Sequence, residues 1–204
     1  MSGDDKMSNR DIPDWMRPFA TVVFVVAVMW VLEVIDLLPG LNLDQWGIRP
    51  RSLRGLIGIG TAPFLHNGFP HLISNTIPLL ILGFLIAASG LQRFVQVMVV
   101  VMVVGGVGTW LTGASGSTHI GASGLVFGFL SYLLARAIFE KKILYLLGGM
   151  VVLFLYGSVL WGLIPKPGIS WQGHIFGAVG GVVAAWMLHK PGDDALPDAK
   201  GLKA

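Results

Sequence analysis

The sequence predicts an all-α polytopic membrane protein, folded as a bundle of six transmembrane helices. Three observations carry this prediction. Of 204 residues, 54% are hydrophobic and only 12% are charged, whereas a soluble domain has roughly 25% charged residues. Six apolar runs reach the length that an α-helix needs to cross a hydrocarbon core about 30 Å thick. None of these runs alternates with a period of two, which excludes membrane-spanning strands.

The six predicted spans leave two polar ends and one long connection. We expect a single domain at 18–190, between an N-terminal tail (1–17) and a C-terminal tail (191–204). The first apolar run is too long for a signal-peptide core, and no cleavage site of small residues follows it, so we interpret it as a retained span. The connection 39–68 is long, and such loops are usually functional or disordered. The spans are predicted at 18–38, 69–88, 92–113, 122–139, 143–164 and 171–189.

The positions of Lys and Arg predict the orientation, because cytoplasmic segments carry an excess of these residues. If the N-terminus is cytoplasmic, ten Lys and Arg residues lie on the cytoplasmic side and four lie outside. We therefore expect both termini in the cytoplasm, and the second, fourth and sixth spans begin in the outer leaflet. A compact six-span chain without a leader fits a prokaryotic cytoplasmic membrane. The four outer residues are Arg49, Arg51, Arg54 and Lys166.

Polar residues mark the beginnings of those three spans. His71 and Asn75 lie in the second span, Ser123 opens the fourth and His174 lies at the start of the sixth. Polar side chains within a membrane are costly and indicate function. His71 and Asn75 are four residues apart and share one helical face. The predicted orientation thus places all four residues at a similar depth.

Together these residues provide the parts that acyl transfer needs. Ser123 lies at a helix N-terminus, where unpaired backbone N–H groups favour developing negative charge. A hydroxyl nucleophile, an imidazole base and donors for an oxyanion complete the set. Taken singly, each residue has an ordinary interpretation as a helix cap, a packing histidine or a bridge between helices. The hypothesis depends on their occurrence together.

A second Gly-Ala-Ser-Gly tetrapeptide occurs at 113–116 and offers Ser115 as an alternative nucleophile. Ser115 is followed by residues typical of a loop, whereas Ser123 is followed by an apolar helical run. Only Ser123 has a helix N-terminus beside it, so we select Ser123. Acidic residues are absent from the interior of the later spans, which predicts a Ser–His pair rather than a triad. Glu33 and Asp36 in the first span are expected to pair with outer-loop arginines or to contact water.

Other chemistry is excluded or unsupported. The chain has no cysteine, which excludes a thiol nucleophile and disulfides. Scattered basic residues form no nucleic-acid patch. No His-Glu-x-x-His motif is present, so we expect no metal and no cofactor. The outer-side histidines that raised the metal alternative are His66, His71, His119 and His174.

Small residues recur at spacings of three and four in the fourth and sixth spans, a pattern that lets membrane helices pack backbone to backbone. Such stripes also occur in transporters, but here they would hold Ser123 close to His174. They comprise Gly121, Gly124, Gly128, Ser131 and Ala135 in one span, and Gly173, Gly177, Gly180, Gly181 and Ala184 in the other.

Residues 46–185 resemble the rhomboid family of intramembrane serine proteases. The resemblance rests on three motifs in order: His71-Leu72-Ile73-Ser74-Asn75, His119-Ile120-Gly121-Ala122-Ser123-Gly124 and Gly173-His174-Ile175-Phe176-Gly177. It implies a rhomboid-like six-helix bundle with a water-filled site that opens outward. It also implies an endopeptidase that cleaves transmembrane segments of membrane proteins near the outer face, within the lipid bilayer.

The resemblance assigns roles to individual residues. It implies that Ser123 is the nucleophile and His174 the general base, and that His71, Asn75 and the Ser123 backbone N–H form the oxyanion hole. Gly121 adds to this hole through the loop conformation that it permits. Many members have a tyrosine where this chain has Phe127, so ring stacking on the histidine survives without a phenol hydrogen bond. Phe127, Gly124, Gly128, Gly177 and Gly181 are thus expected to support the site.

Two further features follow from the resemblance, and two differ from it. The fifth span is expected to form a lateral gate, and residues 164–168 a cap. The Trp-Arg pair that members often have in the first loop is replaced by Trp46 and an arginine cluster, and the glutamate that often follows the second span is missing. Two alternatives remain: a non-catalytic rhomboid-like protein that binds helical clients, and a small-solute transporter or channel, for which internal repeats would be expected.

Overall fold

The computed structural model describes residues 12–140, 143–155, 163–164 and 168–189, and within them the regular structure is helical apart from one isolated β-bridge. The long helices correspond to the predicted apolar runs, and short helices fill the first connection. The helices are α1 (Arg17–Asp36), η1 (Leu43–Trp46), η2 (Leu53–Leu56), α2 (Gly58–Thr61), η3 (Ala62–Phe64), α3 (Phe69–Ala87), α4 (Leu91–Thr112), α5 (Ser123–Phe139), α6 (Ile143–Leu155) and α7 (Trp171–Leu188).

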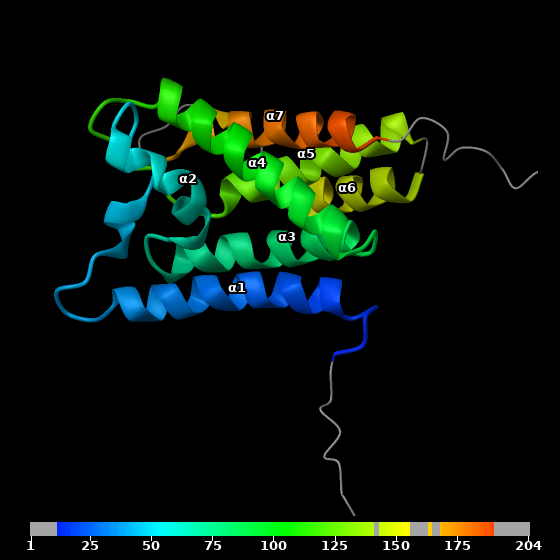
Figure 1. Cartoon of the computed structure of the whole chain (residues 1–204), viewed down its shortest axis with the longest axis horizontal. Helices are drawn as coiled ribbons and strands as arrows, with labels where there is room; N and C mark the ends of the chain where they lie inside the picture. The colour runs from blue at the N-terminus through cyan, green and yellow to red at the C-terminus, as the bar shows by residue number, and fades with distance from the viewer. Residues whose placement is uncertain (1–11, 141–142, 156–162, 165–167, 190–204) are drawn as a thin grey trace, which may run out of the picture.

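The long helices lie along the longest dimension of the molecule, and α4 crosses in front of the others (Figure 1). α1 packs against α3 at one edge, whereas α5 contacts α3, α4, α6 and α7. The short elements between α1 and α3 gather at one end of the bundle, the end at which α3, α5 and α7 begin (Figure 1). The starts of the three helices that carry the candidate residues therefore share one end.

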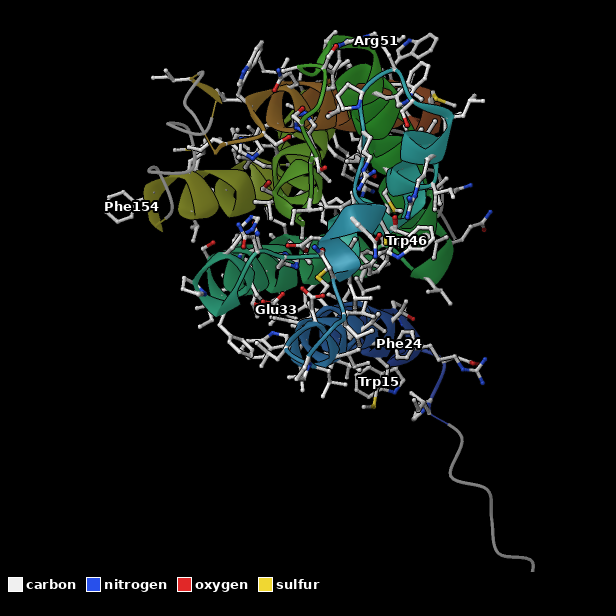
Figure 2. All side chains as sticks on the ribbon, turned by 90° about the vertical axis from the view of Figure 1, so that its left-hand side faces the viewer. Trp15, Phe24, Glu33, Trp46, Arg51 and Phe154 are labelled. Atoms are coloured by element: carbon white, nitrogen blue, oxygen red, sulfur yellow. The ribbon has the colours of Figure 1, made fainter. Side chains whose placement is uncertain are left out.

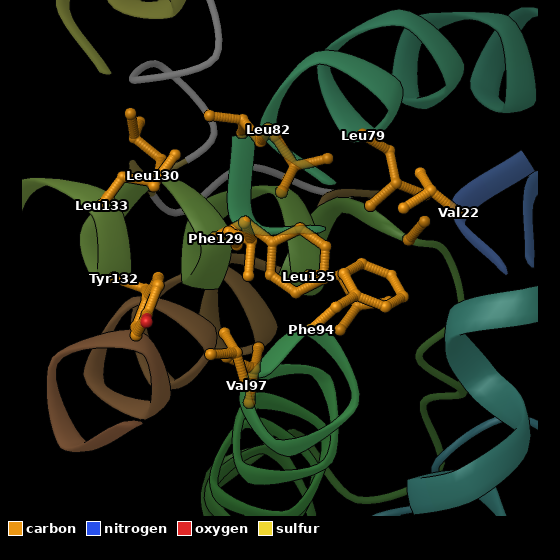
Figure 3. Close-up of a cluster of buried hydrophobic side chains, with 14 of the residues drawn as sticks. Val22, Leu79, Leu82, Phe94, Val97, Leu125, Phe129, Leu130, Tyr132 and Leu133 are labelled. Atoms are coloured by element: carbon orange, nitrogen blue, oxygen red, sulfur yellow. The ribbon is translucent and has the colours of Figure 1, made fainter. Parts of the chain in front are cut away.

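The hydrophobic core surrounds α5, whose few polar residues do not gather into a polar face. A helix without a polar face belongs in the interior of a bundle, and most α5 side chains are buried. Phe129 packs edge-on against Phe94 of α4, with ring centroids 5.8 Å apart. Leu133 of α5 and Leu82 of α3 are 0% exposed and join the same cluster (Figure 3). This packing fixes α5 from several sides.

The outer faces of the helices carry large apolar side chains. Phe24 of α1 is 66% exposed and Phe154 of α6 is 89% exposed, and Figure 2 shows Phe154 pointing away from the bundle. α1, α3 and α4 are each long and apolar enough to cross a membrane, and α5 is a shorter apolar helix. Apolar helices with exposed apolar faces indicate an integral membrane protein. The count of six spans remains a prediction.

The helix bounds agree with the predicted spans to within a few residues, except in the fifth. α6 is described to Leu155, and 156–162 and 165–167 lie outside the described residues. Most of the predicted cap at 164–168 therefore also lies outside them. The same holds for the C-terminal tail and for residues 1–11 of the N-terminal tail.

The long first connection is docked against the bundle. Ile48 forms antiparallel backbone hydrogen bonds with His119, both 2.9 Å long. Contact there is close, because a Cβ added to Gly47 would lie 2.7 Å from the His119 oxygen. On the other side, a Cβ at Gly106 of α4 would lie 2.8 Å from Ile59. Glycines at these points thus let the connection lie on α4 and on the loop before α5.

The acidic residues of α1 do not form the arginine pairs expected for them. Glu33 is only 5% exposed and lies between α1 and α3 (Figure 2). Asp36 accepts the backbone N–H of Leu43. Two arginines of the connection have other partners: Arg51 donates to the Ser115 Oγ, and Arg54 lies over the Trp46 ring at 5.0 Å. The ion pairs within the described ranges are Arg17–Asp14 and Arg136–Glu140.

Candidate active site

Ser123 and His174 meet across the interface of α5 and α7. The Ser123 Oγ lies 2.7 Å from the His174 Nε2, within hydrogen-bond distance. Ser123 is the first residue of α5, and His174 lies in the first turn of α7. His174 is 8% exposed. A hydroxyl and an imidazole in this arrangement can exchange a proton.

The small residues of α5 and α7 make this contact possible. A Cβ at Gly177 would lie 2.3 Å from the Gly124 oxygen, and a Cβ at Gly181 would lie 2.0 Å from the Gly128 oxygen. Distances this short leave no room for any side chain. The two helices therefore touch backbone to backbone along the stripe that the sequence predicts, and the carriers of Ser123 and His174 are held close together.

The Phe127 ring stacks on the His174 imidazole. The ring centroids are 4.6 Å apart and the planes differ by 20°. Phe127 lies one turn after Ser123 on α5, so the helix that carries the hydroxyl also supplies a flat surface for the imidazole. Phe127 is 4% exposed and has no polar atom to bond the imidazole. Stacking on a buried ring restricts the rotation of His174.

His71 faces the loop that precedes Ser123. Gly121 has a φ of +111°, and a Cβ there would lie 2.6 Å from His71 Cε1. Only glycine fits such a conformation against the imidazole. The Asn75 Nδ2 donates to the His71 backbone oxygen at 3.1 Å; the amide carries two N–H groups, so this bond uses one of them.

These side chains share a large cavity. It has a volume of about 810 Å³, and Ser123, His174, His71, Asn75 and Phe127 all line it. This volume lies within the range of small-molecule sites, roughly 300–1,000 Å³. The other polar lining residues are Asp44, Asn67, Ser74, Ser117, Thr118, His119 and Ser170.

Sequence reasoning missed the position of His66, which it considered only as a metal ligand. The His66 Nε2 accepts the backbone N–H of Ala122 at 3.2 Å, and the imidazole is 2% exposed. Burial, aided by the nearby His71, lowers the pKa of His66 to about 4. The imidazole is therefore neutral at pH 7 and keeps the lone pair that this bond requires. His66 thus holds the backbone immediately before Ser123.

The alternative nucleophile has different surroundings. The Ser115 Oγ accepts a hydrogen bond from Arg51 at 2.7 Å, in an exposed loop. The same arginine donates to the Leu111 oxygen at 2.9 Å. Ser115 therefore takes part in docking the first connection onto the end of α4, and no histidine is its recorded partner. Within the described ranges, no group of three or more metal-ligating side chains is found.

Comparison with known proteins places this chain in a family. A family model described as Rhomboid domain matches residues 54–191, more than half of the chain. An uncharacterized protein of Mycobacterium tuberculosis is 47% identical over 188 residues, which cover 88% of this chain and 78% of that protein. An uncharacterized protein of Mycobacterium leprae is 46% identical over 186 residues, covering 87% and 74%.

A more distant relative carries a functional name. The Bacillus subtilis protein named "Putative rhomboid protease YdcA" is 28% identical over 191 residues, which cover 85% of this chain and 90% of that protein. The family model and the long stretch shared with these bacterial relatives agree with the resemblance that the three sequence motifs indicate. This chain belongs to the rhomboid family.

Proposed function

We propose that this protein is an intramembrane serine endopeptidase that cleaves transmembrane segments of other membrane proteins near the outer face. Family membership supports an intramembrane protease. The single observation that carries the finer proposal is the 2.7 Å contact between the Ser123 Oγ and the His174 Nε2, at the edge of the large cavity. Ser123 is the nucleophile and His174 the general base of this Ser–His dyad.

The proposed reaction proceeds in two steps. The His174 Nε2 accepts the Ser123 hydroxyl proton while Oγ attacks the peptide carbonyl carbon, and the carbonyl oxygen becomes an oxyanion. When the C–N bond breaks, the same proton passes from Nε2 to the leaving amine, which leaves an acyl ester on Ser123. Water then attacks the ester carbonyl while the His174 Nε2 accepts a proton from it; the bond between the acyl carbon and Oγ breaks, Nε2 returns the proton to the Ser123 Oγ, and the acid product leaves.

The oxyanion is proposed to bind His71, Asn75 and the backbone N–H of Ser123. The N–H groups in the first turn of α5 have no intrahelical partners, and the N-terminus of a helix favours negative charge. Gly121 contributes through its positive φ, which brings the loop against the His71 imidazole. Each removed donor is expected to cost about 10²–10³ in kcat.

The proposed topology has six spans, formed by α1 and α3 to α7, with both termini in the cytoplasm. The excess of Lys and Arg on that side supports this orientation, and the bacterial relatives support a bacterial membrane. Residues 18–190 form the domain, between two cytoplasmic tails. The active end then faces outward, where water can enter the cavity. Suitable substrates are single-span helices that unwind easily at their outer ends and have small residues at the cut, because a regular helix hides its peptide bonds.

Active-site labelling tests the proposal directly. A fluorophosphonate probe in reconstituted vesicles should label the wild-type protein, and the label should disappear in Ser123→Ala. Ser115→Ala, a serine replacement in the neighbouring tetrapeptide, is the matched control and should keep its label. Cleavage of a co-expressed single-span substrate should fall by at least 10³-fold in Ser123→Ala and His174→Ala. Full cleavage in either variant, with the protein folded, would disprove the dyad.

A further inference from the structure

His119 connects three segments that are remote in the sequence. Its backbone pairs with Ile48 in the first connection through two hydrogen bonds of 2.9 Å. Its imidazole Nε2 lies 2.8 Å from the Ser117 Oγ, within the loop before α5. Its Nδ1 lies 2.6 Å from the Ser170 Oγ, at the N-terminus of α7. The His119 side chain is 8% exposed, and its contacts lie at the wall of the cavity.

The partners of Ser117 fix the proton positions in this chain of hydrogen bonds. The Ser117 hydroxyl donates to the Ala114 oxygen at 2.7 Å, so it accepts the Nε2–H of His119. A neutral imidazole then has a lone pair on Nδ1, which accepts the Ser170 hydroxyl proton. Burial lowers the pKa of His119, which favours this neutral form. The Ser170 side chain accordingly makes no capping bond to α7, although it occupies the N-cap position.

The bond between His119 and Ser170 joins the two segments that carry the reacting atoms. His119 precedes Ser123 by four residues, and Ser170 precedes His174 by four. The Ser170 backbone oxygen accepts the backbone N–H of His174 at 3.2 Å. The link is thus separate from the Ser123–His174 contact, yet it spans the same interface, one helical turn away.

The surroundings leave the two side chains little freedom. A Cβ at Gly113 would lie 2.7 Å from the His119 Nε2, and a Cβ at Gly173 would lie 2.9 Å from the Ser170 Oγ. A glycine therefore lies against each partner, and neither side chain can move toward that glycine without meeting its backbone. A hydrogen bond between groups held in this way can set the separation of the segments that carry it.

We propose that His119 is a positioning residue, which acts through Ser170 to hold the first turn of α7 at the distance from Ser123 that proton transfer requires. Its backbone pairing with Ile48 extends this constraint to the first connection. This inference rests on the proposed function, because it concerns the distance within the proposed dyad. Both ring nitrogens of His119 bond serine hydroxyls, those of Ser117 and Ser170, so His119 acts through its neighbours.

Substitutions that cut the link from either side test the proposal. Turnover of a single-span substrate should fall about 10- to 100-fold in His119→Ala and in Ser170→Ala, because a 1 Å misplacement can cost about 10²-fold. KM should change less than about twofold, since the cavity wall is largely kept. His119→Asn, whose Oδ1 can take the acceptor position of Nδ1, should recover most of kcat. The double variant His119→Ala/Ser170→Ala should be no slower than the slower single variant, because both remove one bond.

The rate of fluorophosphonate labelling, measured per folded molecule, separates positioning from stability. Positioning predicts that this rate falls together with kcat in both single variants and is unchanged in the Ser115→Ala control. Unchanged labelling rates per folded molecule, with only a lower melting temperature, would overturn the inference. A kcat of the double variant that falls by the product of the two single losses would also overturn it. If His119→Ala does not fold, Ser170→Ala and His119→Asn give the same comparison. A wild-type protein without Ser123-dependent labelling would instead refute the proposed function itself.

Discussion

Replacement of Gly177 by alanine measures how closely the backbone contact of α5 and α7 sets the geometry of the dyad. The new Cβ would lie 2.3 Å from the Gly124 oxygen, and real Cβ atoms essentially never show contacts under 3.0 Å. Because the opposing atom is backbone and cannot rotate away, the helices must separate by about 0.7 Å. The Ser123 Oγ to His174 Nε2 distance of 2.7 Å then grows to about 3.4 Å, beyond a good hydrogen bond.

The expected loss of kcat is about 10- to 100-fold, in line with the cost of misplacing reacting groups by up to 1 Å. Alanine favours a helix over glycine by about 0.5–1 kcal/mol, whereas overpacking costs about 1–3 kcal/mol. We therefore expect a net destabilisation of about 1 kcal/mol, too small to unfold the protein. The deciding measurement is kcat per folded molecule on a single-span substrate in reconstituted vesicles, because it separates a loss of geometry from a loss of stability.

The matched control is Gly60→Ala. Gly60 is exposed, and a Cβ there would meet nothing within 4 Å. This variant should keep wild-type kcat and should be at least as stable as wild type. If Gly177→Ala also keeps kcat within twofold of wild type, the contact does not set the dyad distance, and the reasoning from helix separation is refuted.

Two further predictions concern stability. Burial lowers the pKa of His66 from 6.5 to about 4. Between these two pH values the unfolded chain therefore binds more protons than the folded protein. The free energy of unfolding should have its full value above pH 6.5 and should fall as the pH drops toward 4. In His66→Gln the side-chain oxygen can still accept the Ala122 N–H. The melting temperature of this variant should depend less on pH in this window than that of wild type. An equal pH dependence in the two proteins would contradict the lowered pKa of His66. Arg136→Met removes the 2.8 Å partner of Glu140 at a buried site and should cost about 3 kcal/mol or more. The double variant Arg136→Met/Glu140→Leu should recover most of this loss in a thermal melt, and a single variant as stable as wild type would count against it.

The helices and the approach of Ser123 to His174 could be anticipated from the sequence. Apolar runs of the right length predict where each helix begins and ends, because the membrane demands both properties at once. Alternating directions of the spans then place Ser123, His174 and His71 at one end. The family and its membrane character are confirmed by the Rhomboid domain match. The roles of the site residues remain predictions.

The contacts of the loops could not be anticipated. His66 reaches Ala122 across 56 residues, and His119 reaches Ser170 across 51. No periodic pattern reports such contacts, because they depend on loop conformations rather than on helix geometry. Of the two alternatives expected for Glu33, pairing with an outer arginine is not found among the described residues, since the fold of the first connection gives Arg51 and Arg54 other partners. The available signal for these contacts was a histidine near a glycine-rich loop, but the same pattern also fitted a metal ligand.

The direct backbone contact of α5 and α7 has a consequence for motion. Along the glycine stripe no side chains separate the two helices, so rotamer changes there cannot alter their spacing, and we expect the helices to move as a single rigid body. In the proposed enzyme, the reactive pair is therefore assembled before any client arrives, and amide hydrogens along this seam should be among the slowest to exchange. Opening the enzyme to a client then falls to the peripheral helices, and selectivity is decided by which segments gain entry rather than by assembly of the nucleophile.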